Sequence, residues 1–360
     1  MSIELIRAIY DSQTPLPDDV NFYHKSLQDI EHDGVESQVY FLLKQQDRLK
    51  QTPSFFQDLL KESYEKGLYQ NLFIKNQTDQ ILKLFEGNKI DVIALKGVYF
   101  AEEFFGHIGA RVSTDIDLLI RDQDLAKAIH LTNSLGFTIE EEMIPGHFHC
   151  SYSKALPQSE VPLVVELHWS IVKENTSSFD INDLWDQAKP VGHFSHIKEL
   201  SPNHTFYMIC LHGWRHNLDL MRYFLDIIQV INKYSLVLDY QVIFALAADH
   251  QTLKRMIRTL SIVYQVFPHL NNTLRLPIKK KRNLWEYRPV KGLKQYVDFL
   301  DYQFFSFDSI KHSFIEVGNW IWPSKYELSS QVENDSRGFA MYLLLYKKRV
   351  ASMVKAIFLH

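Results

Sequence analysis

The chain has 360 residues, of which 46% are hydrophobic and 23% are charged, a composition typical of a globular protein large enough for two or three domains. Its formal net charge of -4 gives no reason to expect a broad surface for nucleic acid. The two cysteines, Cys150 and Cys210, predict neither a disulfide framework nor a thiolate metal site, and they fit a reducing, cytoplasmic compartment. Because the sequence contains no secretory signal and no run of about 18 apolar residues, we expect no membrane association.

The first part of the chain shows a helical pattern. Between residues 35 and 87 apolar residues recur at helical spacing, with an interruption at Pro53 and an end at Gly87. This spacing predicts a helical N-terminal region that comprises residues 1–88.

Residues 89–200 carry the strand-like runs of the chain, with one clear helix pattern among them. The runs are DVIALKG, DIDLLI, FTIEEEM, FHCSYSK and PLVVELHWSIV. The helix pattern DQDLAKAIHLTNSLG follows the second run, and we expect Asp122 to cap this helix and Gly136 to end it. These elements predict an α+β fold in which a mixed β-sheet with flanking helices lies between helical N- and C-terminal regions.

The second run contains an anomaly, because RVSTDIDLLI, residues 111–120, places two charges in an apolar, β-branched stretch. In a strand, Asp115 and Asp117 point to the same face with their Cα atoms about 6.6 Å apart, while Ile116 and Leu118 point into a core. Repulsion between the carboxylates and the cost of burying them call for a cation or for an exposed position. Two interpretations are therefore open: a cation site, and a solvated edge strand whose charges discourage pairing.

The first run ends at Lys96-Gly97, and a helix pattern follows it. The first turn of such a helix offers free backbone N–H groups and the positive end of the helix dipole, to which Lys96 would add a charge. Phosphate binding is one interpretation of this segment. A glycine turn with an exposed lysine is the other.

The last strand-like run, PLVVELHWSIV, also places a carboxylate in an apolar stretch. Alternation places Glu166 and His168 on one strand face and apolar residues on the other. We expect the three carboxylates to share a cation. Acids on two strands match the requirements of two-metal phosphoryl transfer, in which hard divalent ions bind carboxylate, water and phosphate oxygens.

The sequence after Pro202 is again mostly helical and predicts a helical C-terminal domain, residues 201–360. On one continuous helix, five polar side chains of HGWRHNLDLMRYFLD fall within about 80° of one another: His212, His216, Asp219, Tyr223 and Asp226. Three interpretations are open: the lining of a cleft for an acceptor, a satisfied structural network, and a metal site at the His212 and His216 spacing. We expect ordinary surface positions for the basic cluster at residues 279–282 and for four further histidines: His147, His149, His193 and His196.

Three motifs together, LKG, RVSTDIDLLI and VVELHW, resemble the nucleotidyltransferase fold of the DNA polymerase beta superfamily, and more closely a bacterial family described as uncharacterised nucleotidyltransferases. The resemblance implies that Asp115, Asp117 and Glu166 bind metal ions, Mg²⁺ or Mn²⁺, and serve catalysis. This chain has Gly97-Val98 where the superfamily usually has Gly-Ser or Gly-Gly. The donor pocket implied for this chain is formed by Lys96, Gly97, Arg111 and Ser113. For Arg111, an ion pair at the surface is the other interpretation.

The resemblance implies an enzyme that moves a nucleoside monophosphate from a nucleoside triphosphate (NTP) to a hydroxyl of a small-molecule or peptide acceptor, with release of pyrophosphate. A peptide acceptor fits because members of this family are often encoded beside the machinery for ribosomally made peptides. We expect four residues to line the acceptor site: His168, His212, His216 and Asp226. Two alternatives are a toxin-like transferase acting on tRNA, against which the net charge of -4 argues, and a catalytically silent nucleotide-binding module, against which the intact acids argue.

Overall fold

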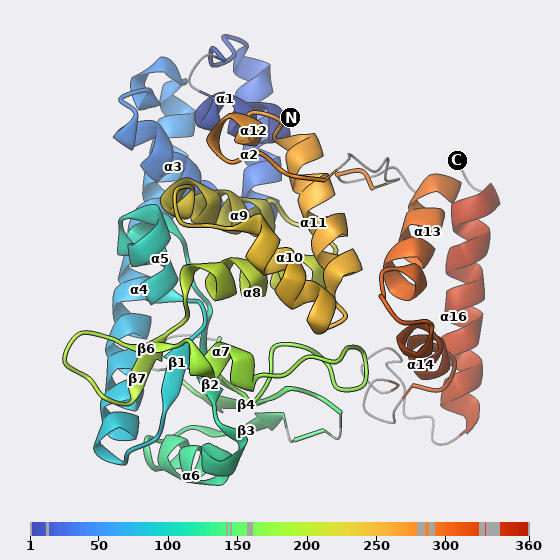
Figure 1. Ribbon diagram of the computed structural model, residues 1–360. Helices are drawn as coiled ribbons and strands as arrows, with labels where there is room; N and C mark the ends of the chain where they lie inside the picture. The colour runs from blue at the N-terminus through green and yellow to red at the C-terminus, as the bar shows by residue number, and fades with distance from the viewer. Residues whose placement is uncertain are drawn as a thin grey trace.

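The N-terminal part of the chain is helical, as its apolar spacing predicts. The computed structural model describes residues 2–11, 14–141, 143–144, 146–156, 161–278, 285–287, 292–323, 328 and 339–358. Pro53 has an extended backbone and immediately precedes the longest helix, so the predicted interruption is confirmed. The elements of this part are α1 Ser2–Tyr10, α2 Val20–Asp33, α3 Glu36–Gln45, a 3₁₀ turn Leu49–Gln51 and α4 Ser54–Gly87 (Figure 1).

A mixed sheet follows α4. The described residues form seven strands in the order β3-β4-β5-β2-β1-β7-β6. β2 pairs in parallel with β5, and β1 pairs in parallel with β7, while the other neighbours are antiparallel. All five strand-like runs form strands, which confirms the predicted α+β class. The strands are β1 Val92–Ala94, β2 Asp115–Ile120, β3 Thr138–Glu141, β4 His149–Lys154, β5 Leu163–His168, β6 Lys189–Pro190 and β7 Ile197–Glu199.

The helix predicted after β2 is present, but its start differs from the expectation. The chain leaves β2 through a one-turn 3₁₀ segment, Asp122–Asp124, and the helix proper begins only after Asp124, with no side-chain cap. Asp122 therefore lies inside the preceding turn and does not cap the helix. Gly136, in the left-handed region at φ +86°, follows its end as expected. The helical elements of this region are α5 Val98–Phe105, the 3₁₀ turns Ile108–Ala110 and Asp122–Asp124, α6 Leu125–Ser134 and α7 Asn182–Asp186.

The remainder of the chain is mostly helical, as predicted. The basic cluster Lys279 to Arg282 lies outside the described residues. No helix among the described residues is long and apolar enough to span a lipid bilayer. The elements are α8 Pro202–Arg215, α9 Met221–Tyr234, α10 Tyr240–Asp249, α11 Leu253–Val266, α12 Leu270–Thr273, α13 Leu293–Leu300, a π-helical turn Asp301–Phe305, α14 Ile310–Ile321 and α16 Phe339–Phe358.

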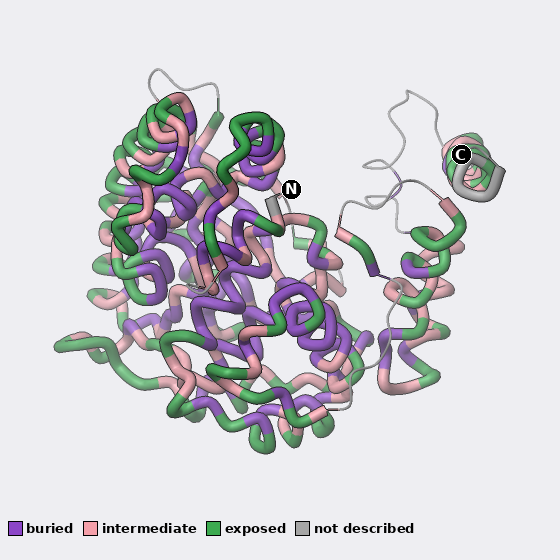
Figure 2. The backbone as a smooth tube through the Cα atoms, turned by 90° about the horizontal axis from the view of Figure 1, so that it is seen from above, coloured by how far each residue is buried: buried purple, intermediate pink, exposed green. Residues whose placement is uncertain are grey.

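The sheet lies between two apolar cores because its side chains alternate between two faces. Ile93 and Leu119 belong to one core, together with residues of α1–α3 and α8–α11. Leu118 and Val165 belong to the other core, together with residues of α4 and α6. Figure 2 shows buried residues throughout this main body, with α13, α14 and α16 beside it. Side chains two residues apart on a strand share a face. Asp115 and Asp117 therefore lie on the same face of β2 as Leu119, and this face is turned toward α8 and α9.

Helices of the first and last parts of the chain thus contribute to one core. The domain division expected from the sequence, at residues 1–88, 89–200 and 201–360, stays a prediction.

Candidate active site

Three acidic side chains meet on the face of the sheet that is turned toward α8. Asp115 and Asp117 lie at the start of β2, and Asp117 is the register partner of Glu166 on β5. One oxygen from each of the three carboxylates lies within 4.8 Å of the others. Asp117 is buried, at 2% exposure, whereas Asp115 and Glu166 are half-buried. Three carboxylates at this spacing form a donor set that fits a hard divalent cation.

The surroundings shift the pKa values of Asp115 and Asp117 in opposite directions. Burial alone raises the pKa of Asp117, but Lys96 and His168 outweigh it and hold that pKa well below its usual range. Lys96 Nζ is 3.0 Å from one oxygen of Asp117, and His168 Nε2 is 3.0 Å from the other. Burial and the negative charge of Asp117 raise the pKa of Asp115. Asp117 is therefore a compensated anion, while the charge of Asp115 is the costly one that a bound cation would stabilise.

His168 connects the acids of the two strands. Its Nε2 lies 3.1 Å from Glu166, in addition to its contact with Asp117, and its side chain is only 3% exposed. Burial raises the pKa of Glu166, but the hydrogen bond from His168 and its charge outweigh burial and lower it. Glu166 is therefore ionised at neutral pH, which is the form that accepts a proton. The acceptor-lining role expected of His168 stays a prediction, since this residue contacts the acids directly.

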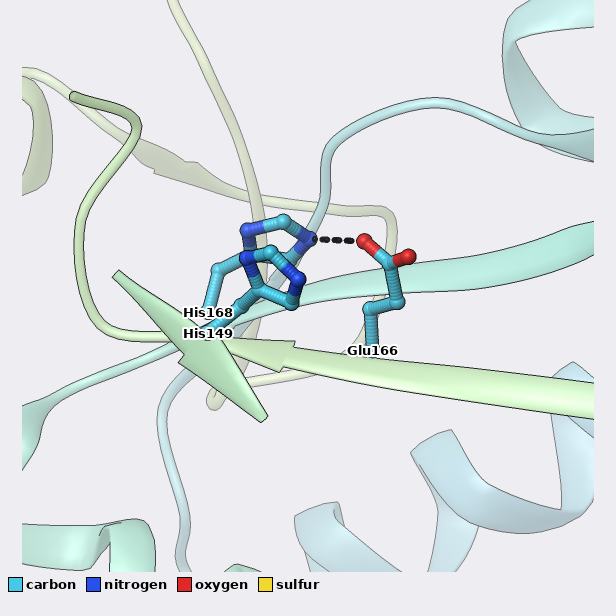
Figure 3. A group of neighbouring side chains, drawn as sticks. All are labelled: His149, Glu166 and His168. Atoms are coloured by element: carbon cyan, nitrogen blue, oxygen red, sulfur yellow. Dashed lines mark ion pairs between the residues drawn. The ribbon is translucent and has the colours of Figure 1, made fainter. Parts of the chain in front are cut away.

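His149 forms a second candidate metal group with Glu166 and His168, and the sequence interpretation missed it (Figure 3). His149 pairs in register with His168 across β4 and β5, and the ring centroids are 5.0 Å apart. Burial and the charge of His168 lower the pKa of His149 to about 4, so its imidazole is neutral at pH 7. His149 is half-buried, so the expected surface position was wrong. The alternation of FHCSYSK carries the missed signal, because it places His149 on the face opposite the buried Cys150.

The donor-pocket residues expected from the sequence lie around the aspartates at different depths. Gly97, at φ +79°, turns the chain from β1 into α5, and a Cβ there would lie 3.6 Å from the carbonyl oxygen of Asp115. Ser113 is 2% exposed, and its hydroxyl has no hydrogen-bond partner among the described residues. Its backbone N–H donates to the Asn71 side chain. Gly97 and Lys96 thus adjoin the acids directly, while Ser113 lies beneath the surface.

Arg111 and Asp226 form a buried ion pair. Arg111 Nε and Nη2 donate to the two oxygens of Asp226 at 2.7 and 2.8 Å. Only 12% of the Arg111 side chain and 2% of the Asp226 side chain are exposed. One edge of the guanidinium is thus occupied by a carboxylate where the sequence predicted phosphate. Phosphate binding by Arg111 and acceptor binding by Asp226 stay predictions.

The polar stripe expected on one helix is in fact distributed over two helices. α8 ends at Arg215, and Asn217 and Leu218, both in the left-handed region, turn the chain into α9. The turn still gathers three rings: His216 stacks on Tyr223 at 4.7 Å, and His212 lies 4.9 Å from His216 and 5.3 Å from Tyr223.

The charge state of His212 follows from its contact with Lys96. Burial and the positive charge of Lys96 hold the pKa of His212 well below its usual range. His212 Nε2 is 3.1 Å from Lys96 Nζ, and because an ammonium only donates, Nε2 is the acceptor. His212 is thus part of the network that orients Lys96 toward Asp117. Acceptor binding by His212 and His216 stays a prediction.

Comparison with known proteins agrees with this geometry. Residues 24–268 match the model of a family described as uncharacterised nucleotidyltransferase, and the chain belongs to this family. Searches of curated proteins and of solved structures gave no match. Membership and the acidic cluster support nucleotidyl transfer as the general activity, with an NTP as a substrate and a divalent metal at the acids. The matched range includes every site residue discussed above and ends before α12.

Proposed function

We propose that this protein transfers a nucleoside monophosphate from an NTP to a hydroxyl of a small-molecule or peptide acceptor in the presence of Mg²⁺ or Mn²⁺. The observation that carries the proposal is the meeting of Asp115, Asp117 and Glu166, whose oxygens lie within 4.8 Å of one another. Membership of the DNA polymerase beta superfamily, a bacterial source, a cytoplasmic setting and a role in peptide natural-product biosynthesis belong to the same proposal.

The acids would hold the metal, and the groups around them have distinct roles. A bound divalent cation supplies positive charge to the triphosphate and acidity to the attacking hydroxyl. Asp115 and Asp117 orient the donor, while Lys96 and the N–H groups at the start of α5 contact its phosphates. Glu166, ionised beside His168, accepts the proton of the acceptor hydroxyl.

The chemistry is a single displacement at the α-phosphorus. The acceptor oxygen forms a bond to that phosphorus, and the bond between the phosphorus and its bridging oxygen breaks. Pyrophosphate leaves with the electron pair of that bond. The proton of the acceptor hydroxyl moves to Glu166, so charge and atoms balance.

The proposal is tested with each NTP carrying radioactive phosphorus at the α-phosphate. Purified protein, Mg²⁺ and a cell extract should yield labelled acceptor together with pyrophosphate. The same NTPs labelled at the γ-phosphate should give no labelled acceptor, which separates nucleotidyl transfer from phosphoryl transfer. The Asp115→Asn variant serves as the matched inactive control. The proposal fails if no NTP binds to the protein with Mg²⁺ in calorimetry, or if the acceptor acquires the γ-label.

A further inference from the structure

A cavity of about 340 Å³ adjoins the acids on the side of His149. It lies between the loops at the ends of β4 and β5, the end of α8 and the C-terminal helices. Its volume is within the range of small-molecule sites, about 300–1,000 Å³. The walls are mainly apolar and include Phe148, Ile171, Val172, Leu211, Trp214 and Phe307.

Arg215 brings a positive charge to the part of this cavity closest to the acids. Its guanidinium lies over the ring of Phe148, with Cζ 4.6 Å from the centroid. Among the described residues, the guanidinium has no ion pair and no hydrogen-bond acceptor. Asp117 and Glu166 act on Arg215 through their charge but lie beyond ion-pair distance. A half-buried guanidinium with one face stacked and its N–H groups available is suited to an anionic group.

The far end of the cavity contains a second arginine that is already engaged. Arg255 is 1% exposed and lies between the rings of Trp214 and Phe307, at 4.5 and 4.7 Å. It donates to the carbonyl of Thr176, and the carboxylate of Glu316 offsets its charge. The far end therefore offers aromatic surface, while the arginine with available N–H groups is Arg215.

One wall of the cavity comes from the part of the chain after the family match, which ends at residue 268. Four lining residues belong to it: Tyr302, Gln303, Phe307 and Glu316. Polar contacts fix this wall to the main body. The Tyr302 hydroxyl donates to the carbonyl of Arg215 at 2.6 Å, and Asp308 accepts from the backbone N–H groups of Leu253 and Lys254 at 2.5 and 2.7 Å.

From these contacts we infer that the cavity is the acceptor site and that the acceptor combines an apolar, ring-sized body with an anionic group, a carboxylate or a phosphate. This inference rests on the proposed function. The anionic group would bind Arg215, the body would lie against Trp214 and Phe307, and the hydroxyl would point toward Glu166. The C-terminal helices would thus determine acceptor specificity.

Four phenol probes of matched size test the inference by calorimetry on the full chain: phloretate, the alkyl phosphate of tyrosol, tyrosol and tyramine. The two anions should bind about 10-fold to 100-fold more tightly than neutral tyrosol, as expected for a charge-assisted hydrogen bond, and cationic tyramine should bind least. The tighter of the two anions identifies the preferred acceptor group. Equal affinity for anions and tyrosol, or no binding of any probe, would overturn the inference.

Arg215→Gln should reduce the affinity of both anions to that of tyrosol and leave Mg·NTP affinity and the thermal midpoint unchanged. Arg275→Gln, an exposed arginine away from the cavity, is the control with the same charge change and should keep wild-type affinities. If Arg215→Gln does not fold, Arg215→Lys must retain at least part of the preference for anions. Loss of Mg·NTP affinity with unchanged probe affinity would assign Arg215 to the donor and overturn the inference.

Two measurements on the wild type separate this inference from the proposed function. Probe binding without any Mg·NTP binding would refute the proposed function, while the cavity would still be shown to bind anions. Mg·NTP binding without probe binding would remove the cavity assignment alone.

Discussion

Asp117 on β2 and Glu166 on β5 are direct register partners in a parallel ladder, although they are far apart in the sequence. Because side chains alternate along a strand, a shift of one residue in this pairing would turn Glu166 to the opposite face of the sheet. The apolar partners on that face, Leu118 and Leu167, are fully buried and fix the register. The spacing of the three acids is thus determined by the packing of the core beneath them.

Asp115→Asn should abolish Mg²⁺ binding while leaving the free protein at least as stable as the wild type. The substitution removes the carboxylate whose pKa is raised by burial and by the charge of Asp117, so repulsion inside the cluster decreases. Calorimetry with Mg²⁺ and thermal unfolding in EDTA check the two effects.

The matched control for Asp115→Asn is Asp117→Asn. It should also lose Mg²⁺ binding, but it should lower the unfolding midpoint in EDTA, because Lys96 and His168 lose their anionic partner. Wild-type Mg²⁺ affinity in both variants would contradict the assignment of the metal site.

Lys96→Gln should destabilise the metal-free protein by about 3 kcal/mol, because it leaves a buried carboxylate without one of its two cationic partners. Lys96 Nζ is 3.0 Å from Asp117, and their side chains are 13% and 1% exposed. Added Mg²⁺ should restore part of this loss, so the unfolding midpoint of the variant should increase more with Mg²⁺ than that of the wild type.

Lys75→Gln is the control for Lys96→Gln, since it breaks an exposed pair with Glu102 that is worth at most about 1 kcal/mol. Similar losses in the two lysine variants, measured by chemical denaturation, would show that the contact between Lys96 and Asp117 does not stabilise the fold.

Arg111 and Asp226 should behave as one unit in a double-mutant cycle. Each alanine substitution alone leaves the other charge buried and should cost about 3–5 kcal/mol, while the double substitution should cost much less than the sum. The cycle is measured by chemical denaturation of the three variants and the wild type. Strictly additive losses would mean that the paired hydrogen bonds between Arg111 and Asp226 contribute no coupling energy.

The sheet and its acids could be predicted from the sequence because a strand has a fixed period of two. The same period that places Ile116 and Leu118 in a core places Asp115 and Asp117 together on the other face. The period also predicts that Glu166 and His168 share a face. Local alternation was therefore sufficient to place the acids on one face of the sheet.

The contacts between distant elements could not be predicted in this way. The partner of Arg111 is Asp226, on a helix that periodicity joined to α8. The break between α8 and α9 depends on Asn217 and Leu218 in the left-handed region, a conformation that Leu218 does not suggest, since leucine rarely adopts it. Which helix packs on the sheet is decided by tertiary packing, and a single sequence carries no direct signal of it.

Asp91→Asn should destabilise the protein at neutral pH, and the difference from the wild type should disappear in acid. Asp91 directly precedes β1. Its carboxylate accepts from Lys198 Nζ at 2.7 Å and from His196 Nδ1 at 2.8 Å. Burial raises its pKa, but the hydrogen bonds from Lys198 and His196 outweigh burial and lower the pKa. A carboxylate with a lowered folded-state pKa stabilises the fold above its unfolded pKa of about 3.9, and this contribution is lost as the pH falls from that value through the lower folded-state pKa.

The measurement for Asp91 is the unfolding free energy at pH 7 and at pH 3 by chemical denaturation. The expected loss in Asp91→Asn is about 1 kcal/mol at pH 7, where Lys198 and Arg121 pair with a partly exposed carboxylate. Asp58→Asn, at an exposed position on α4, should show no such dependence on pH. A loss in Asp91→Asn that is equally large at pH 3 would indicate a packing defect and not a charge effect.

Glu166→Gln should separate chemistry from donor binding. The proposed role of Glu166 is to accept the proton of the attacking hydroxyl, and removal of a general base typically lowers a rate by about 10²–10⁴. In the proposed function the aspartates and Lys96 hold the donor, so Mg·NTP affinity should stay within a few-fold of the wild type. An alternative role would be a structural pair between Glu166 and Lys96 or Arg111. These cations pair with Asp117 and Asp226, and the close cationic neighbour of Glu166 is His168, at 3.1 Å.

The test combines three measurements on Glu166→Gln: Mg·NTP affinity, unfolding midpoint and transfer rate. Glutamine keeps the shape of glutamate and an oxygen that can accept from His168, so the midpoint should stay close to that of the wild type. Glu140→Gln, the same substitution at an exposed position on β3, is the matched control. Lost transfer in Glu166→Gln, with normal donor binding and with transfer retained in Glu140→Gln, is the expected pattern. Retained transfer with weakened Mg·NTP binding would place Glu166 in the donor site and remove it from the chemistry.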